Sequence, residues 1–207
     1  MGTYKEVEGN LITLAQQGKY DVITHGCNCF CSMQAGIAPQ MAKAFGCDKF
    51  PKEKRYGIEV GLDGLEHTVE TGNVGDINKL GTIDYLTQTR SGGTSEFDIF
   101  DFDLTVVNSY TQYHYGRNHK DGVLIPVDYD AIRMCMRKIN YLFKGKKIGL
   151  PKIGAGLAGG IWEKREMTEE QHKFYLTNKI KYPQDDIKTI IQEELKDCDV
   201  TIVIFKP

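Results

Sequence analysis

Apolar and polar residues along the chain follow helical and extended spacings in turn. Residues 128–143 form the clearest predicted helix, because their apolar positions fall three and four residues apart and Asp128 stands at the expected N-cap. Further helices are predicted over residues 11–17, 38–45 and 186–195. Short β-branched or apolar runs predict strands over residues 5–7, 21–25, 82–87, 104–110, 147–150 and 200–205.

The order of these elements predicts the fold class. Strands alternating with helices favour an α/β fold, in which helices cover both faces of a sheet. We expect one domain over residues 1–207, because this length suits a single core. Residues 96–103 are acidic and aromatic, which indicates a protruding hairpin with solvated charges. Three polar or glycine-rich stretches are interpreted as insertions at the rim of the sheet: residues 54–75, 89–101 and 164–183.

Composition narrows the function classes. The 207 residues include 26 basic and 28 acidic side chains, which gives a net charge of −2. Strong nucleic-acid binding is not expected, because it needs a clearly basic balance. No apolar run suits a signal peptide or a bilayer span, so we expect no membrane contact and a cytoplasmic location. In that reducing compartment the six cysteines are expected to be free thiols.

Two loops rich in small residues each follow a predicted strand. The first covers residues 25–38 and leads into a helix, and the second covers residues 151–163. Small residues let backbone N–H groups surround an anion, and a helix N-terminus adds a favourable dipole. Two such loops at the carboxyl ends of strands are suited to a diphosphate. The alternative is a pair of tight turns that bind nothing.

Other motif classes are disfavoured by their context. Residues 154–159 match GxGxxG, but too little chain follows for a dinucleotide-binding βαβ unit, and no Walker A sequence occurs. Cys27, Cys29 and Cys31 alternate too closely for a usual zinc site, so we expect neither a metal nor a cofactor. A reactive thiol among the three stays open, although packing beneath the loop is expected for at least two of them.

At these loops the sequence resembles the macrodomain family, whose members bind ADP-ribose. The resemblance spans nearly the whole chain apart from the insertions. It is most similar to the short phosphatase-type macrodomains, which process ADP-ribose 1″-phosphate, and it implies a three-layer α/β/α fold with a mixed, mostly parallel sheet. The matching segments are residues 7–12 (VEGNLI), 25–28 (HGCN), 35–38 (AGIA), 107–112 (VNSYTQ) and 150–157 (LPKIGAGL).

The resemblance also implies site residues by matching position. Asn28 matches an asparagine that hydrogen-bonds the distal ribose next to the reacting carbon, and His25 matches the histidine of the phosphatase-type signature. The implied neighbours of the adenine are Gly9, Asn10, Leu11 and Ile12. Further ligand contacts, mostly in the two phosphate loops, are implied for Gln34, Ala35, Gly36, Ile37, Ala38, Thr111, Gly154, Ala155, Gly156, Leu157 and Ala158.

Three positions depart from patterns in the family. Asn10 replaces an aspartate that accepts from the adenine amino group in many macrodomains, and it offers an uncharged acceptor instead. Gln112 and Ala158 stand where some relatives that remove ADP-ribose from proteins or DNA carry Lys and Asp. These replacements disfavour a lysine-based covalent mechanism.

The sequence therefore predicts a metal-independent hydrolase that binds ADP-ribose or ADP-ribose 1″-phosphate and removes the 1″-phosphate. His25 is the candidate acid or base, since an unperturbed imidazole titrates near pH ~6.5. A buried imidazole at a strand end is the other interpretation of His25. Asn28 would orient a ribose hydroxyl or the attacking water. Two other functions stay open: removal of ADP-ribose from protein or nucleic acid, and non-catalytic recognition of ADP-ribose.

Overall fold

The computed structural model describes residues 2–50, 56–60, 65–70, 72–92, 100–116 and 124–205. Its main sheet has six strands in the order β1-β8-β7-β2-β6-β5. Neighbouring strands are parallel except for β5 and β6, which confirms the predicted mixed, mostly parallel sheet. The strands are β1 (Tyr4–Glu8), β2 (Val22–Asn28), β5 (Ile83–Gly92), β6 (Phe100–Gln112), β7 (Lys147–Leu150) and β8 (Asp199–Ile204).

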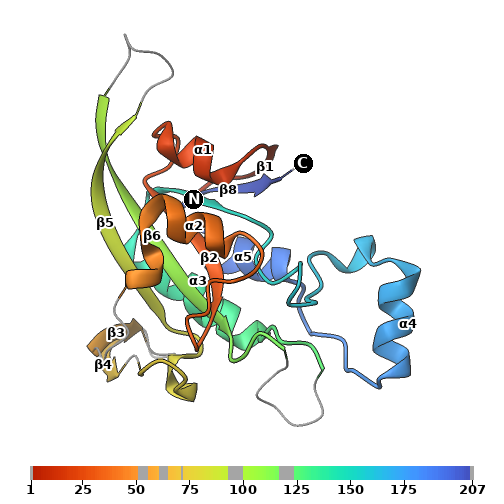
Figure 1. Cartoon of the computed structure of the whole chain (residues 1–207). Coiled ribbons are helices and arrows are strands. Elements are labelled where there is room, and N and C mark those ends of the chain that lie inside the picture. Colours follow the sequence, from red (N-terminus) through yellow and green to blue (C-terminus); the bar gives the residue numbers. More distant parts are fainter. Residues whose placement is uncertain are drawn as a thin grey trace.

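Helices cover both faces of this sheet (Figure 1). Ile23 of β2 packs with Met41 in the cluster beneath α1 and α2, whereas the preceding Val22 packs with Ile139 in the cluster beneath α3 and α5. Successive strand residues point to opposite faces, so a strand buried on both sides reads as a continuous apolar run. These helices are α1 (Leu11–Gln16), α2 (Ala38–Phe45), α3 (Tyr129–Leu142) and α5 (Ile187–Glu194).

Local sequence signals set the ends of these four helices. The side chains of Asn10, Asp128 and Asp186 accept backbone N–H hydrogen bonds in the first turns of α1, α3 and α5. Helix α2 ends at Gly46, whose φ of 66° is a left-handed conformation that glycine adopts without steric cost. Because periodicity and caps agree, each observed helix lies within one residue of its predicted bounds at either end.

The strands β5 and β6 are longer than predicted and form a hairpin that extends past α1 (Figure 1). Ser91 pairs with Asp101, so the described part of residues 89–101 continues the main sheet rather than forming a separate insertion. Phe100 and Phe102 alternate with aspartates, which is the period-two pattern of a strand. The predicted hairpin is confirmed for residues 100–103, and residues 93–99 lie outside the described residues.

The stretch interpreted as a first insertion contains a small hairpin of its own. Strand β3 (Tyr56–Val60) pairs antiparallel with β4 (Glu66–Glu70) in a second, two-stranded sheet. Residues 54–55, 61–64 and 71 of that stretch lie outside the described residues. Two short 3-10 turns flank the hairpin along the chain, namely η1 (Cys47–Lys49) and η2 (Ile77–Lys79).

The stretch interpreted as a third insertion is largely helical. The 3-10 turn η3 (Lys164–Glu166) precedes α4 (Glu169–Thr177), and Thr168 and Gln171 form a capping box at the start of α4. Figure 1 shows α4 projecting away from the main sheet. Over the described parts of the chain, no helix combines the length and the apolar character that a membrane span needs.

Candidate functional site

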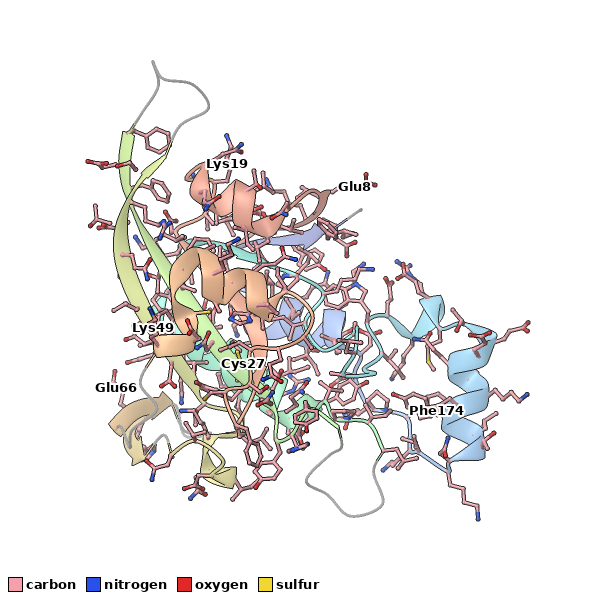
Figure 2. All side chains as sticks on the ribbon, viewed as in Figure 1. Glu8, Lys19, Cys27, Lys49, Glu66 and Phe174 are labelled. Atoms are coloured by element: carbon pink, nitrogen blue, oxygen red, sulfur yellow. The ribbon has the colours of Figure 1, made fainter. Side chains whose placement is uncertain are left out.

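A cleft opens where three adjacent strands end. Strands β7, β2 and β6 are parallel neighbours, so the loops after their carboxyl ends lie at one edge of the sheet. Cys27, near the end of β2, marks this edge in Figure 2. The volume of about 640 Å³ is typical of a small-ligand site. The cleft is lined by Gly26, Cys27, Asn28, Ser32, Gln34, Ala35, Gly36, Ile37, Ala38, Thr111, Gln112, Tyr115, Pro151, Lys152, Ile153, Gly154, Gly156, Leu157 and Ala158.

The first loop is shaped by Asn28 and by a glycine. The pairing register of β2 with β6 shifts between Cys27 and Asn28, and the Asn28 side chain then forms hydrogen bonds with the backbone of Ser32. Its Oδ1 accepts from the Ser32 N–H at 3.2 Å, and its Nδ2 donates to the Ser32 carbonyl at 3.3 Å. Gly36 has a φ of 62°, and a Cβ there would meet nothing within 4 Å. The loop is therefore held at its start by Asn28 and open at Gly36.

The second loop depends on glycine for a different reason. A Cβ on Gly154 would lie 2.8 Å from Val127 Cγ2, so only glycine fits against this part of the core. The Gly160 N–H donates to the Gly154 carbonyl at 2.8 Å, and this bond closes the loop. A Cβ on Gly156 would meet nothing within 4 Å, so this stretch of backbone is open to a ligand.

The floor of the cleft is formed by the ends of β2 and β6. Thr111 is buried, and a Cβ on Gly26 would lie 2.9 Å from its Oγ1. Glycine at position 26 therefore lets the threonine hydroxyl approach the neighbouring strand closely. The Thr111 carbonyl accepts from the Asp128 N–H at 2.9 Å, which ties the floor to the start of α3.

The structure brings most of the predicted ligand contacts together and leaves some apart. Residues of both loops and of the ends of β2 and β6 meet in the cleft: Asn28, Gln34, Ala35, Gly36, Ile37, Ala38, Thr111, Gly154, Gly156, Leu157 and Ala158. Ala155 instead packs against the core cluster beneath α3 and α5. Five other predicted residues do not line the cleft: Gly9, Asn10, Leu11, Ile12 and His25.

Asn10 has a structural role that was not considered when it was predicted to contact adenine. Its Oδ1 accepts from the backbone N–H groups of Ile12 at 2.9 Å and Thr13 at 3.2 Å. This is the N-cap of α1, and the carbonyl acceptor that was expected to face adenine is occupied by the helix. An asparagine directly before a helical run is itself a signal for this role.

His25 is buried away from the cleft, and this corrects its predicted role. Its side chain is fully buried, with Nε2 2.9 Å from Asn108 Oδ1, and Asn108 Nδ2 in turn donates to the Cys47 carbonyl at 2.9 Å. Burial lowers the pKa of His25 to about 4, because the charged imidazolium loses its hydration. A neutral imidazole without access to the ligand does not support proton transfer, so the buried interpretation of His25 fits the structure.

The three alternating cysteines pack beneath the first loop. Cys27 and Cys29 are buried and join the Tyr110 ring in a small cluster, while Cys31 is half-buried beside it. Burial raises the pKa of the Cys29 thiol to about 12 and raises that of Cys27 as well, so both stay protonated near neutral pH. Within the described ranges, no three His, Cys, Asp or Glu side chains are grouped in a way that could hold a metal ion.

Sequence reasoning missed several residues that line the cleft, among them a cation. Lys152 lies at the edge of the cleft, with Nζ 3.8 Å from Glu166 Oε2 and 5.4 Å from the centre of the Trp162 ring. Trp162 itself is a buried core residue. The available signal was the position of Lys152 at the start of the second loop, two residues after a predicted strand. Tyr115 was missed because its segment follows β6 beyond the predicted strand.

Comparisons with known proteins found a sequence relative and solved structures that resemble this chain. No protein-family model matches the chain. An uncharacterized 17.5 kDa protein from the tk-vs intergenic region of Enterobacteria phage T4 is 31% identical over 163 residues, which are 77% of this chain and 83% of the phage protein. The structure of Thermosipho africanus DarTG in complex with ADP-ribose matches 100% of this chain and 42% of that chain, with a TM-score of 0.53 and 13% identity. The macrodomain of Thermus aquaticus DarG covers 100% of both chains at a TM-score of 0.48 and 16% identity.

Proposed function

The chain belongs to the same family as the 17.5 kDa phage T4 protein and has the α/β macrodomain fold, and from this premise we propose that it binds ADP-ribose and hydrolyses ADP-ribose 1″-phosphate. The structure of Thermosipho africanus DarTG, which shares this fold, is a complex with ADP-ribose. The products are ADP-ribose and inorganic phosphate. The observation that carries the proposal is the cleft between two loops of small residues, with Asn28 between them.

The two loops suit the phosphate groups of this ligand. A Cβ on Gly36 or Gly156 would meet no other atom within 4 Å, so a phosphate oxygen has room to approach the backbone at these two positions. Helix α2 begins directly after the first loop, and its N-terminus adds a favourable dipole toward an anion. Lys152 adds a positive charge at the edge of the cleft. These features together favour a diphosphate over an uncharged ligand.

The proposed chemistry assigns charge stabilisation to the backbone and orientation to Asn28. Water bonds to the phosphorus, the bond between phosphorus and the 1″ oxygen breaks, and this oxygen takes up a proton as phosphate leaves. The N–H groups of the second loop hold the phosphoryl oxygens, whose charge grows in the transition state. Asn28 orients the distal ribose while its contacts with Ser32 fix its own side chain. None of the described histidines lines the cleft, so we assign the proton to solvent rather than to an imidazole.

Phosphate release and ligand binding test this proposal together. We expect the protein to release phosphate from ADP-ribose 1″-phosphate at neutral pH with EDTA present, and to bind ADP-ribose in a calorimetric titration. Binding without phosphate release would favour recognition of ADP-ribose, or its removal from a macromolecule, over the phosphatase activity. Absence of both would contradict the assignment of the cleft to ADP-ribose.

A further inference from the structure

Four rings form a continuous aromatic surface next to the reactive end of the cleft, and we call them the aromatic shelf: Phe30, Tyr113, His114 and Tyr115. The Phe30 ring centre lies 5.3 Å from that of Tyr113 and 5.1 Å from that of His114, both edge to face. The rings of His114 and Tyr115 lie 4.1 Å apart at an angle of 30°, close to stacking. Such geometries are favourable for aromatic rings.

The position of the shelf follows from the strands that precede it. Phe30 comes two residues after Asn28 at the end of β2, and Tyr113 directly follows Gln112 at the end of β6. Asn28 and Gln112 pair with each other across these two strands. The shelf therefore begins where the proposed function places the distal ribose and its reacting carbon.

Backbone contacts hold the shelf in one arrangement. The Cys29 N–H donates to the carbonyls of Gln112 and Tyr113, each at 3.1 Å, which joins the two segments that carry the rings. The Tyr113 hydroxyl donates to the Gly75 carbonyl at 3.1 Å. A Cβ on Gly75 would lie 3.3 Å from the Phe30 ring, so the backbone there lies directly beneath it. A surface organised in this way loses little entropy when a ligand binds.

Two of the rings are exposed, although they carry large apolar surfaces. Tyr115 is 67% exposed and also lines the cleft, and Phe30 is 40% exposed. Apolar rings would not stabilise a phosphate on the reacting carbon, because an anion is stabilised by N–H donors and cations. Clustered exposed aromatic residues at the edge of a site are typical of ligand-binding surfaces.

We propose that the aromatic shelf stacks a planar heteroaromatic ring that is joined to the 1″ carbon of the bound ADP-ribose. The inference rests on the proposed ADP-ribose site and extends it to a ligand class other than the 1″-phosphate. Two sources carry this chemistry: the nicotinamide of free NAD⁺, and a base in an ADP-ribosylated oligonucleotide. Tyr115 is the contact residue, because it alone among the four rings also lines the cleft.

Affinities of the Tyr115→Ala variant for ligands with and without the ring test the proposal. Stacking on one aromatic side chain contributes about 1–3 kcal/mol, so we expect the variant to lose about 5- to 150-fold in affinity for a ring-bearing ligand. The variant should lose less affinity for ADP-ribose than for the ring-bearing ligand, since ADP-ribose has no ring at this position. The Tyr115→Phe variant should keep the full affinity because it keeps the ring.

Matched ligands and a matched surface variant complete the experiment. Phe174→Ala removes an exposed ring from α4, which lies far from Cys27 in Figure 2, and should change no affinity. If Tyr115→Ala loses affinity for both NAD⁺ and a base-linked ADP-ribosyl oligonucleotide, the proposal is supported for both sources of the ring. If it loses affinity for one of them, that ligand is the source. An equal loss for ADP-ribose and for the ring-bearing ligands, or no loss at all, would overturn it. Failure of the unmutated protein to bind ADP-ribose would overturn the proposed function as well.

Discussion

Lys79 and Asp84 form an ion pair inside the protein, with Nζ 2.9 Å from Oδ2 and side-chain exposures of 0% and 3%. The Tyr110 hydroxyl donates to the same Oδ2 at 2.7 Å, and Lys79 Nζ lies 4.3 Å from the centre of the Tyr110 ring. Burial and the Asp84 carboxylate raise the pKa of Tyr110, so its hydroxyl stays protonated. Cys31 of the first loop lies beside this group, its Sγ 3.5 Å from the Tyr110 oxygen. A buried charge network therefore supports the first loop from below.

Removal of one member of this pair should destabilise the protein strongly. Lys79→Met leaves the Asp84 carboxylate buried without its cation, and we expect the free energy of unfolding in urea to fall by about 3–5 kcal/mol. The double variant Lys79→Met, Asp84→Asn removes both charges and keeps an acceptor for Tyr110, so it should recover at least half of that loss. A single variant as stable as the unmutated protein would show that the pair contributes little.

The depressed pKa of His25 predicts how stability depends on pH. An unfolded histidine titrates near pH ~6.5, whereas folded His25 titrates at about 4, so between these values the unfolded state binds more protons. Stability is therefore fully present above pH ~6.5 and is lost as the pH falls toward 4. Between pH 7 and 4.5 this one group should remove about 2 kcal/mol from the free energy of unfolding.

The variant His25→Gln isolates this effect from the titration of carboxylates. Glutamine can keep a hydrogen bond to Asn108 but does not titrate, so the variant should lose about 2 kcal/mol less than the unmutated protein over the same pH range. An NMR titration should place the pKa of the His25 imidazole near 4. An imidazole that titrates near pH ~6.5 would instead mean that His25 is accessible to solvent.

Gly36→Glu should abolish binding of ADP-ribose. Gly36 lines the cleft and a Cβ there would meet no protein atom within 4 Å, so a glutamate has room at this position and would bring a negative charge to the loop where a phosphate is proposed to bind. We expect an increase in Kd of at least about 100-fold in calorimetry, equivalent to about 3 kcal/mol. The backbone strain of a side chain at this positive φ costs about 1 kcal/mol of folding stability in addition.

Gly46→Glu is the matched control for that strain. Gly46 has a φ of 66°, and a Cβ there also meets nothing within 4 Å, but it lies at the opposite end of α2 from the first loop. It should therefore lose similar stability and keep its affinity for ADP-ribose. Unchanged affinity in Gly36→Glu would remove the first loop from the binding site.

Elements with a strong local signal could be predicted from the sequence. The apolar spacing in α3 and α5 and the expected N-cap at Asp128 predicted the bounds of both helices closely, because helix periodicity depends on residues near each other in the chain. The length of β6 was underestimated, because its outer part is polar and is stabilised by pairing with β5. Cross-strand pairing is not visible in one segment alone.

The parts of the candidate site that could be predicted are those where the backbone conformation requires a particular residue type. Gly36 and Gly154 marked the two loops, because few residues other than glycine adopt their positive φ. The side on which His25 points was not predictable, since both faces of β2 are buried and its partner Asn108 comes from β6. Tyr115 reaches the cleft only because β2 and β6 end side by side, which is a property of the assembled sheet.

Asn28→Ala should reduce turnover more than binding. A group that orients the reacting ribose acts mainly in the transition state, so we expect kcat for ADP-ribose 1″-phosphate to fall about 100-fold while Kd for ADP-ribose changes less than about threefold. The variant also loses both hydrogen bonds to the Ser32 backbone, which should lower the free energy of unfolding by about 1–3 kcal/mol. Ser32→Ala keeps the backbone groups that Asn28 contacts and should retain most of the turnover. Equal losses in kcat and in affinity would make Asn28 a binding residue, because the distal ribose would then be held equally well before and during the reaction.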